Sequence, residues 1–115
     1  MDSLAALKDH LEQHYQLRCI LSSPDDVWSR EQNIVARLDC CRVDEEGLNR
    51  GLMYFLVDAS ETFYLGTFHG PIFRIVRAAD LQPIAEALLG WQQDGVRFSD
   101  RIERLSKLFA IEEIL

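Results

Sequence analysis

Two adjacent cysteines, Cys40 and Cys41, are the residues of this sequence with the clearest chemical potential. A pair of thiols can bind a metal ion, form a disulfide or act as nucleophiles. They lie in the run NIVARLDCCRV, residues 33–43, which has the composition of a β-strand. Neighbouring side chains of a strand point to opposite faces, so the two thiols diverge and cannot bind one metal ion. A disulfide between adjacent residues would strain the extended backbone, and we expect both cysteines to be small packed side chains.

The alternation of this strand also predicts a local irregularity. Strict alternation places Ile34, Ala36, Leu38 and Cys40 on one face, and its continuation would bury the charged Arg42. We therefore expect a β-bulge near Cys40 and Cys41, which shifts the register and turns Val43 inward.

The histidines are the next candidates for chemistry. His10 and His14 are four residues apart, a spacing that puts both on one side of a helix and occurs in metal sites. A metal site there would need a third ligand, such as His69, a cysteine or a carboxylate. His69 itself precedes Gly70 and Pro71, and a histidine in such a loop can act as an acid or a base. The alternative is that Gly70 and Pro71 only form the turn, with His69 exposed beside them.

The sequence lacks the familiar catalytic and nucleotide-binding motifs. It has no phosphate-binding P-loop, and GxGxxG, GxSxG, HExxH and CxxC are equally absent. We therefore assign no catalytic residue, no metal and no cofactor, and we expect a non-enzymatic protein. The alternative is a small-molecule or enzymatic site built from His69, Tyr64 and Cys41.

Charge and composition exclude several classes of partner. The 115 residues carry 19 acidic and 12 basic side chains, a net charge of −7, which disfavours binding to nucleic acid and suits a basic partner. No apolar run is long enough to span a membrane, and the N-terminus lacks the pattern of a signal peptide. Three cysteines, an odd number, agree with a reducing compartment, so we expect a cytoplasmic protein.

The elements that position these residues follow from periodicity and turn residues. An amphipathic helix is expected over residues 3–17, and a one-turn helix capped by Ser23 is expected around Trp28. Two further helices begin at Asp80 and at Ser99 or Asp100. Strands are expected over residues 18–21, 33–43, 52–58, 62–68 and 72–77. Short connections favour antiparallel hairpins. We predict one α+β domain over residues 1–115: an N-terminal helix, a four- to five-stranded, mainly antiparallel meander, and two C-terminal helices.

The distribution of apolar residues favours association. The strands are apolar on both faces, and the last helix has a second apolar stripe of Leu108, Ile111 and Leu115 beside Arg101 and Arg104. We therefore expect a homodimer, and an adaptor or chaperone-like module that holds a peptide or protein partner. A structural subunit of a larger assembly is a further alternative. The candidate contact residues are Trp28, Tyr54, Tyr64, Phe68, Trp91, Arg101, Arg104, Leu108 and Ile111.

Overall fold

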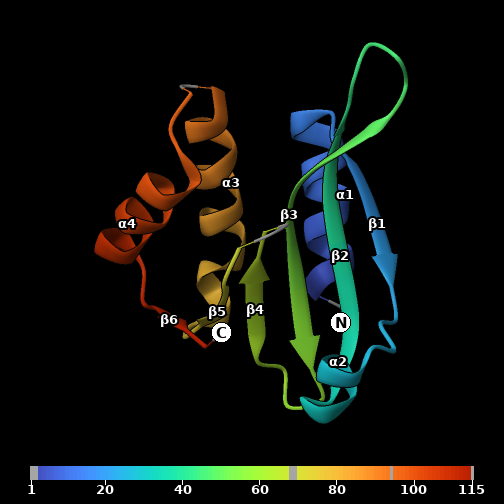
Figure 1. Ribbon diagram of the computed structural model, residues 1–115, viewed down its shortest axis with the longest axis vertical. Coiled ribbons are helices and arrows are strands. Elements are labelled where there is room, and N and C mark those ends of the chain that lie inside the picture. The colour runs from blue at the N-terminus through green and yellow to red at the C-terminus, as the bar shows by residue number, and fades with distance from the viewer. Residues whose placement is uncertain (1–2, 68–69, 94, 115) are drawn as a thin grey trace.

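The chain forms an antiparallel sheet with helices on both of its faces. The computed structural model describes residues 3–67, 70–93 and 95–114. The helices are α1 (Ser3–Tyr15), α2 (Val27–Glu31), α3 (Leu81–Gln93) and α4 (Phe98–Leu108), with a 3-10 turn, η1 (Ala78–Asp80), before α3. The strands are β1 (Arg18–Ser22), β2 (Ile34–Val43), β3 (Asn49–Asp58), β4 (Phe63–Gly66), β5 (Ile72–Ile75) and β6 (Ile111–Glu113). They pair in chain order, β1 to β6, which confirms the predicted α+β meander (Figure 1).

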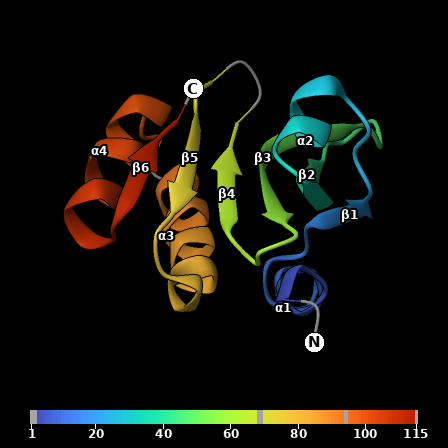
Figure 2. The ribbon, with the colours of Figure 1, turned by 90° about the horizontal axis from the view of Figure 1, so that it is seen from below.

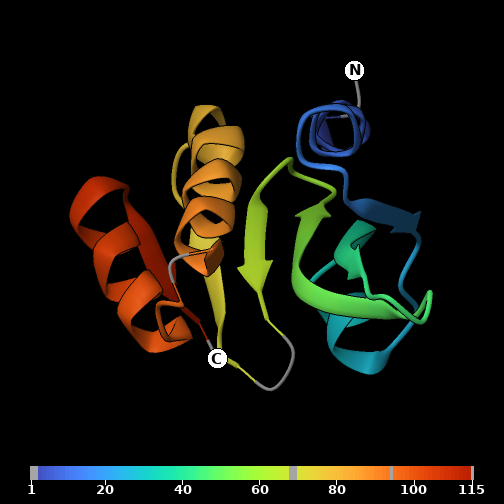
Figure 3. The same ribbon diagram turned by 90° about the horizontal axis from the view of Figure 1, so that it is seen from above.

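The main core lies between the sheet and the helices α1 and α3. These two helices lie on one face of the sheet, and α2 lies on the opposite face (Figure 2). Phe55 and Leu65 of the central strands are completely buried, and they belong to one apolar cluster with Leu11 of α1 and Ile84 of α3. Helix α4 lies beside α3, at the end of the sheet where β6 runs (Figure 3). Its Leu105 is also fully buried and ties this helix to the same core.

A second, smaller apolar cluster lies on the α2 face of the sheet. Ile34, Leu56 and Tyr64 are buried there, and Trp28 of α2 packs against them. The rings of Trp28 and Tyr64 meet edge to face with their centroids 6.3 Å apart. Apolar strand side chains on both faces are therefore buried within one copy of the chain. This removes part of the physical basis on which we expected a homodimer.

The C-terminal segment differs from the prediction. Helix α4 ends at Leu108, and Phe109 already has extended backbone angles, φ −132° and ψ 149°. The following residues form β6, which pairs with β5, so the sheet has six strands where four or five were predicted. Leu108 and Ile111 therefore do not form one helical stripe, and that prediction was wrong; Leu115 lies outside the described residues. The open edge of β5 explains the change, because it offers backbone groups to this segment.

The bulges of β2 fall partly where they were expected. The register shifts between Cys40 and Cys41, as predicted, but Leu52 of β3 is the extra residue. The alternation of β2 therefore continues, and Val43 is 38% exposed and not turned inward. A second shift between Ile34 and Ala36 moves Ile34 to the α2 face, contrary to the expected alternation.

The helix starts also differ in detail. Asp26, and not Ser23, caps α2 by accepting a hydrogen bond from the backbone nitrogen of Ser29. Before α3, the residues Ala78–Asp80 form the 3-10 turn, and the Asp80 carboxylate accepts a hydrogen bond from Nε of Arg77. Helix α4 begins at Phe98, and its N-cap residue, Arg97, makes no side-chain capping bond.

Candidate functional site

A cleft opens on the α2 face of the sheet, where α2 covers one end of the strands and leaves the rest uncovered. We call it the α2 cleft, and its volume is about 280 Å³. Its wall is α2 and its floor comes from β2, β3 and β5. It is lined by Asp26, Trp28, Ser29, Arg37, Tyr54, Leu56 and Ile72.

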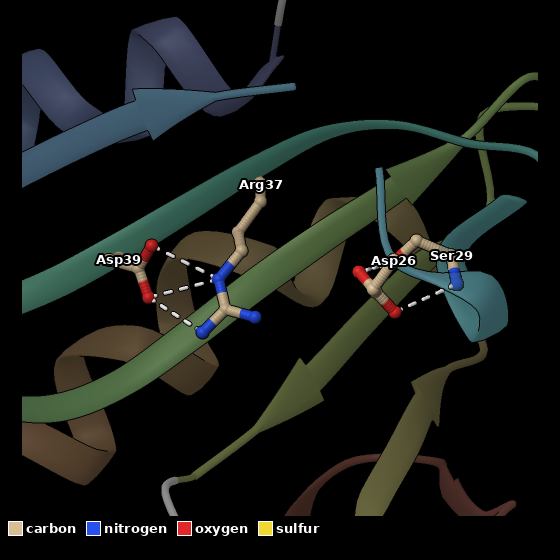
Figure 4. Close-up of polar contacts among 4 residues, drawn as sticks. All are labelled: Asp26, Ser29, Arg37 and Asp39. Carbon is tan, nitrogen blue, oxygen red and sulfur yellow. Dashed lines mark hydrogen bonds and ion pairs between the residues drawn. The ribbon is translucent and has the colours of Figure 1, made fainter. Parts of the chain in front are cut away.

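Arg37 is held in the cleft by a carboxylate and an aromatic ring. Its Nε and Nη2 donate to the carboxylate of Asp39 at 2.9–3.0 Å, and its guanidinium carbon lies 4.1 Å from the centroid of the Tyr54 ring. Figure 4 shows that Nη1 points away from Asp39, toward the side of the cleft where Asp26 lies. Burial alone would lower the pKa of Arg37, but the hydrogen bond that Arg37 donates to Asp39 raises it, so the side chain stays cationic.

Asp26 stands on the opposite side of the cleft from Arg37 (Figure 4). Its carboxylate accepts hydrogen bonds from the Ser29 hydroxyl at 2.7 Å and from the Ser29 backbone nitrogen at 3.1 Å. These bonds hold the pKa of Asp26 below its usual value. The two carboxylates of Asp26 and Asp39 outnumber the single positive charge of Arg37, so these three side chains together carry a net negative charge. They lie beside the aromatic and apolar residues of the cleft.

A larger hollow of about 550 Å³ lies near the start of α1, on the other side of the turn between β3 and β4. The carboxylate of Asp58 lines it but is fully used by the turn: Oδ1 accepts from the nitrogens of Ser60 and Thr62, and Oδ2 accepts from the Tyr64 hydroxyl. The rest of its lining is mostly small and apolar: Ser3, Val35, Ala36, Val57, Ala59, Glu61, Phe63 and Ala78. None of these lining residues is cationic, whereas the α2 cleft holds Arg37 and Asp26 beside the ring of Tyr54, so we take the smaller cleft as the candidate site.

The predicted contact residues divide between two parts of the molecule. Trp28 and Tyr54 line the α2 cleft, and Tyr64 is buried beside it under Trp28. The other described residues lie on α3, on α4 and at the start of β6. Trp91 of α3 lies 5.8 Å from the guanidinium of Arg104, Arg101 donates to the carbonyl of Val96, Leu108 is exposed, and Ile111 packs on the main core. Phe68 lies outside the described residues.

The alternative site of His69, Tyr64 and Cys41 is not assembled by the described residues. His69 lies outside them. Tyr64 pairs with Leu56 of β3, whereas Cys41 pairs with Gly51, five residues earlier on the same strand. Cys41 is 6% exposed, and burial raises the pKa of its thiol. The hydroxyl of Tyr64 is bound to Asp58 and serves the turn.

The pair His10 and His14 belongs to a contact between helices. Their rings lie 4.5 Å apart, and Nε2 of His10 lies 3.4 Å from Oε2 of Glu86 on α3. Over residues 3–67, 70–93 and 95–114, no three side chains of His, Cys, Asp or Glu come together as a possible metal site.

The α2 cleft was not predicted as a site. Neither Asp26, which caps α2 in place of the expected Ser23, nor Arg37 was singled out as a site residue in the sequence. The one available signal was the pair Arg37 and Asp39, two charges on the same face of a strand that is otherwise largely apolar.

Comparison with known proteins adds no family to this description, since no family model, no curated protein and no solved structure matches the chain. Among the described residues, no helix combines the length and the apolar character needed to cross a membrane.

Proposed function

We propose that this protein is a non-enzymatic binding module that holds a short segment of a partner protein in the α2 cleft. The observation that carries the proposal is the combination of aromatic rings with opposite charges in one cleft: Tyr54 of the floor and Trp28 of the wall line it together with Arg37 and Asp26. Aromatic and arginine side chains supply much of the binding energy at protein interfaces.

The size of the cleft favours a peptide side chain over a whole small molecule. Sites for small molecules and cofactors have volumes of roughly 300–1,000 Å³ and enclose most of the ligand. The α2 cleft, at about 280 Å³, is just below that range and open to solvent. It fits one anchoring side chain of a larger partner, whose backbone then lies across the rim.

The charges indicate the chemistry of that segment. Asp26 and Asp39 outnumber Arg37 in and around the cleft, and the whole chain carries a net charge of −7. A basic segment is therefore attracted over distance and finds a carboxylate at the rim. We expect a large apolar or aromatic side chain next to a lysine or arginine.

The test is selection of random peptides displayed on phage by the purified protein, followed by fluorescence anisotropy with synthetic copies. We expect the enriched peptides to combine an aromatic or large aliphatic residue with a neighbouring basic residue. In NMR spectra of the labelled protein, their binding should shift the amide signals of residues 26–29, 37, 54 and 72. Shifts confined to α4 and β6, or no enrichment, would reject the proposal.

Two neighbouring aspartates provide a matched pair of variants. Asp26→Asn removes the charge but keeps the cap, because asparagine caps helices as well as aspartate does. This substitution should lower the affinity for the selected basic peptides roughly threefold to tenfold. Asp25→Asn makes the same change of charge at an exposed neighbour that does not line the cleft, and it should leave affinity within about twofold. Equal effects of the two substitutions would contradict a role for Asp26.

We also propose a cytoplasmic location and a homodimer. The dimer now rests only on the exposed apolar residues at one end of the molecule. Leu108 is 62% exposed and Ile114 is 39% exposed, and both lie at the end of the molecule formed by α4 and the edge strand β6. Exposed apolar side chains beside an open strand edge favour contact with a second copy. One chain has a mass of 13.3 kDa, and static light scattering over a concentration series should show twice that mass. A constant mass of one chain would refute the dimer and leave binding in the cleft untouched.

A further inference from the structure

Two thiols of the main core face each other across neighbouring strands. Cys19 of β1 and Cys40 of β2 are direct partners in the antiparallel register. Their exposed fractions are 4% and 0%, and both belong to the main core cluster. The third cysteine, Cys41, pairs with Arg18 and points to the opposite face.

The positions of Cys19 and Cys40 suit a disulfide. Residues directly opposite in an antiparallel pair have Cα atoms about 4.5 or 5.5 Å apart. Disulfides span Cα distances of about 4.4–6.8 Å, a range that includes both kinds of pair.

The two thiols differ in their surroundings, which assigns them different roles. The backbone nitrogen of Cys19 donates to Oε2 of Glu12 at 3.3 Å, and Glu12 is paired with Lys8 at 2.6 Å. The neighbouring Cys40 lowers the pKa of Cys19, and Lys8 also favours its thiolate, although burial and Glu12 oppose it. Cys19 lies on β1, an edge strand of the sheet, and is 4% exposed, whereas Cys40 lies on the inner strand β2 and is completely buried. Cys19 is therefore the sulfur that peroxide reaches first.

We propose that Cys19 and Cys40 form a reversible disulfide when the protein meets hydrogen peroxide, which makes the pair a redox modification site. The Cys19 thiolate attacks one oxygen of the peroxide, the O–O bond breaks, and the released hydroxide takes up a proton to become water. The sulfur of Cys40 then attacks the sulfenic acid on Cys19, the S–O bond breaks, and the S–S bond forms as the second water leaves with the proton of Cys40. Two thiols are oxidised by two electrons, and one peroxide is reduced to two waters.

The disulfide would close the loop between residues 19 and 40, and this loop carries all of α2. Closing a loop of this length stabilises a fold mainly by restricting the unfolded chain. We expect the melting temperature to rise by roughly 10 °C on oxidation. The modification itself does not depend on the binding function proposed above.

The experiment starts from the fully reduced native protein. It is treated with a small molar excess of hydrogen peroxide, quenched with N-ethylmaleimide, and digested for mass spectrometry without reduction. We expect a loss of two hydrogens from the intact chain, one alkylated thiol at Cys41, and a cross-linked pair of peptides containing Cys19 and Cys40. Dithiothreitol should restore three free thiols and the original melting temperature.

Single substitutions test the assignment of the pair. Cys19→Ser and Cys40→Ala should each abolish the intramolecular disulfide, and circular dichroism verifies that each variant is folded. Cys41→Ser is the matched control and should form the disulfide at the rate of the unmodified protein. Three alkylated thiols after peroxide treatment of the native protein would overturn the proposal. A disulfide through Cys41, or irreversible addition of two oxygens to Cys19, would overturn it as well.

Discussion

The ring of Tyr54 on β3 occupies the space directly above Gly66, its partner on β4. A β-carbon added at Gly66 would overlap the Cζ, Oη and Cε2 atoms of Tyr54. The glycine is therefore required by a close approach of a side chain, and its backbone angles do not require it. The guanidinium of Arg37 lies over the same ring, so Gly66, Tyr54 and Arg37 form one stack at the cleft.

Gly66→Ala should destabilise the protein and disturb the cleft. The added methyl group forces the Tyr54 ring to move from its place beneath Arg37, because the new β-carbon would overlap the ring. Insertions of this kind cost about 1–3 kcal/mol of unfolding free energy. Urea denaturation followed by tryptophan fluorescence measures the loss.

Gly90→Ala is the control for this substitution. Gly90 lies within α3, and apart from its chain neighbours and the helix's own backbone, no atom of the described residues lies within 4 Å of a β-carbon built there. Alanine favours helix more than glycine, so the unfolding free energy should rise by about 0.5–1 kcal/mol. A Gly66→Ala variant as stable as the unmodified protein would contradict the described position of Tyr54.

Arg37 and Asp39 should show measurable coupling in a double-mutant cycle. Their side chains are 28% and 22% exposed, and the guanidinium donates from two nitrogens to one carboxylate. A half-buried pair with two donors is stronger than an ordinary surface ion pair. The substitutions Arg37→Met, Asp39→Asn and their combination should give a coupling energy of about 1 kcal/mol in urea denaturation. Strict additivity would mean that the Tyr54 ring, and not Asp39, holds the arginine.

The helices and most strands could be predicted because their apolar side chains recur at regular intervals. The leucines of α1 repeat at helical spacing and are all buried, and the long strand β2 lies close to its predicted limits. Strand β3 ends where expected but begins at Asn49, within the segment predicted as a turn. The three-residue strand β6 is too short to have a period. Its existence depends on the open edge of β5, a tertiary relationship that a single segment does not reveal.

The candidate site was harder to predict because it depends on registers between strands. Tyr54 lies under Arg37 only because of the β2–β3 register and the glycine at position 66. In the same way, Cys19 opposes Cys40 only because the connection between β1 and β2 has the length it has. In the sequence, the adjacent residues Cys40 and Cys41 were the candidates for chemistry, whereas the structure pairs Cys40 with Cys19 on the neighbouring strand.

Asp26→Ala should destabilise α2 in a way that depends on pH. The carboxylate caps the helix through Ser29, and loss of such a cap costs about 0.5–2 kcal/mol, with the lower end expected at this exposed position. Because its pKa is lowered in the folded state, the contribution is complete above the ordinary aspartate pKa. It is lost as the pH falls through the folded pKa. Urea denaturation of both proteins at pH 7 and at about pH 3 should show a smaller penalty at the lower pH.

Tyr15→Phe should weaken the contact between α1 and α3. The Tyr15 hydroxyl donates to Oε2 of Glu86 at 2.7 Å, and phenylalanine removes this bond while keeping the ring. The penalty should be about 0.5–1 kcal/mol at pH 7, limited by the 35% exposure of the Glu86 side chain.

The pH dependence of that penalty separates the hydrogen bond from simple packing. The bond from Tyr15, followed by that from Gln82, lowers the pKa of Glu86 in the folded state. Its contribution is therefore complete above the ordinary glutamate pKa and is lost as the pH falls through the lowered value. The difference between the Tyr15→Phe variant and the unmodified protein should shrink when urea denaturation is repeated at about pH 3. A penalty that stays constant from neutral to acid pH would show that the hydroxyl group acts through packing and not through the Glu86 carboxylate.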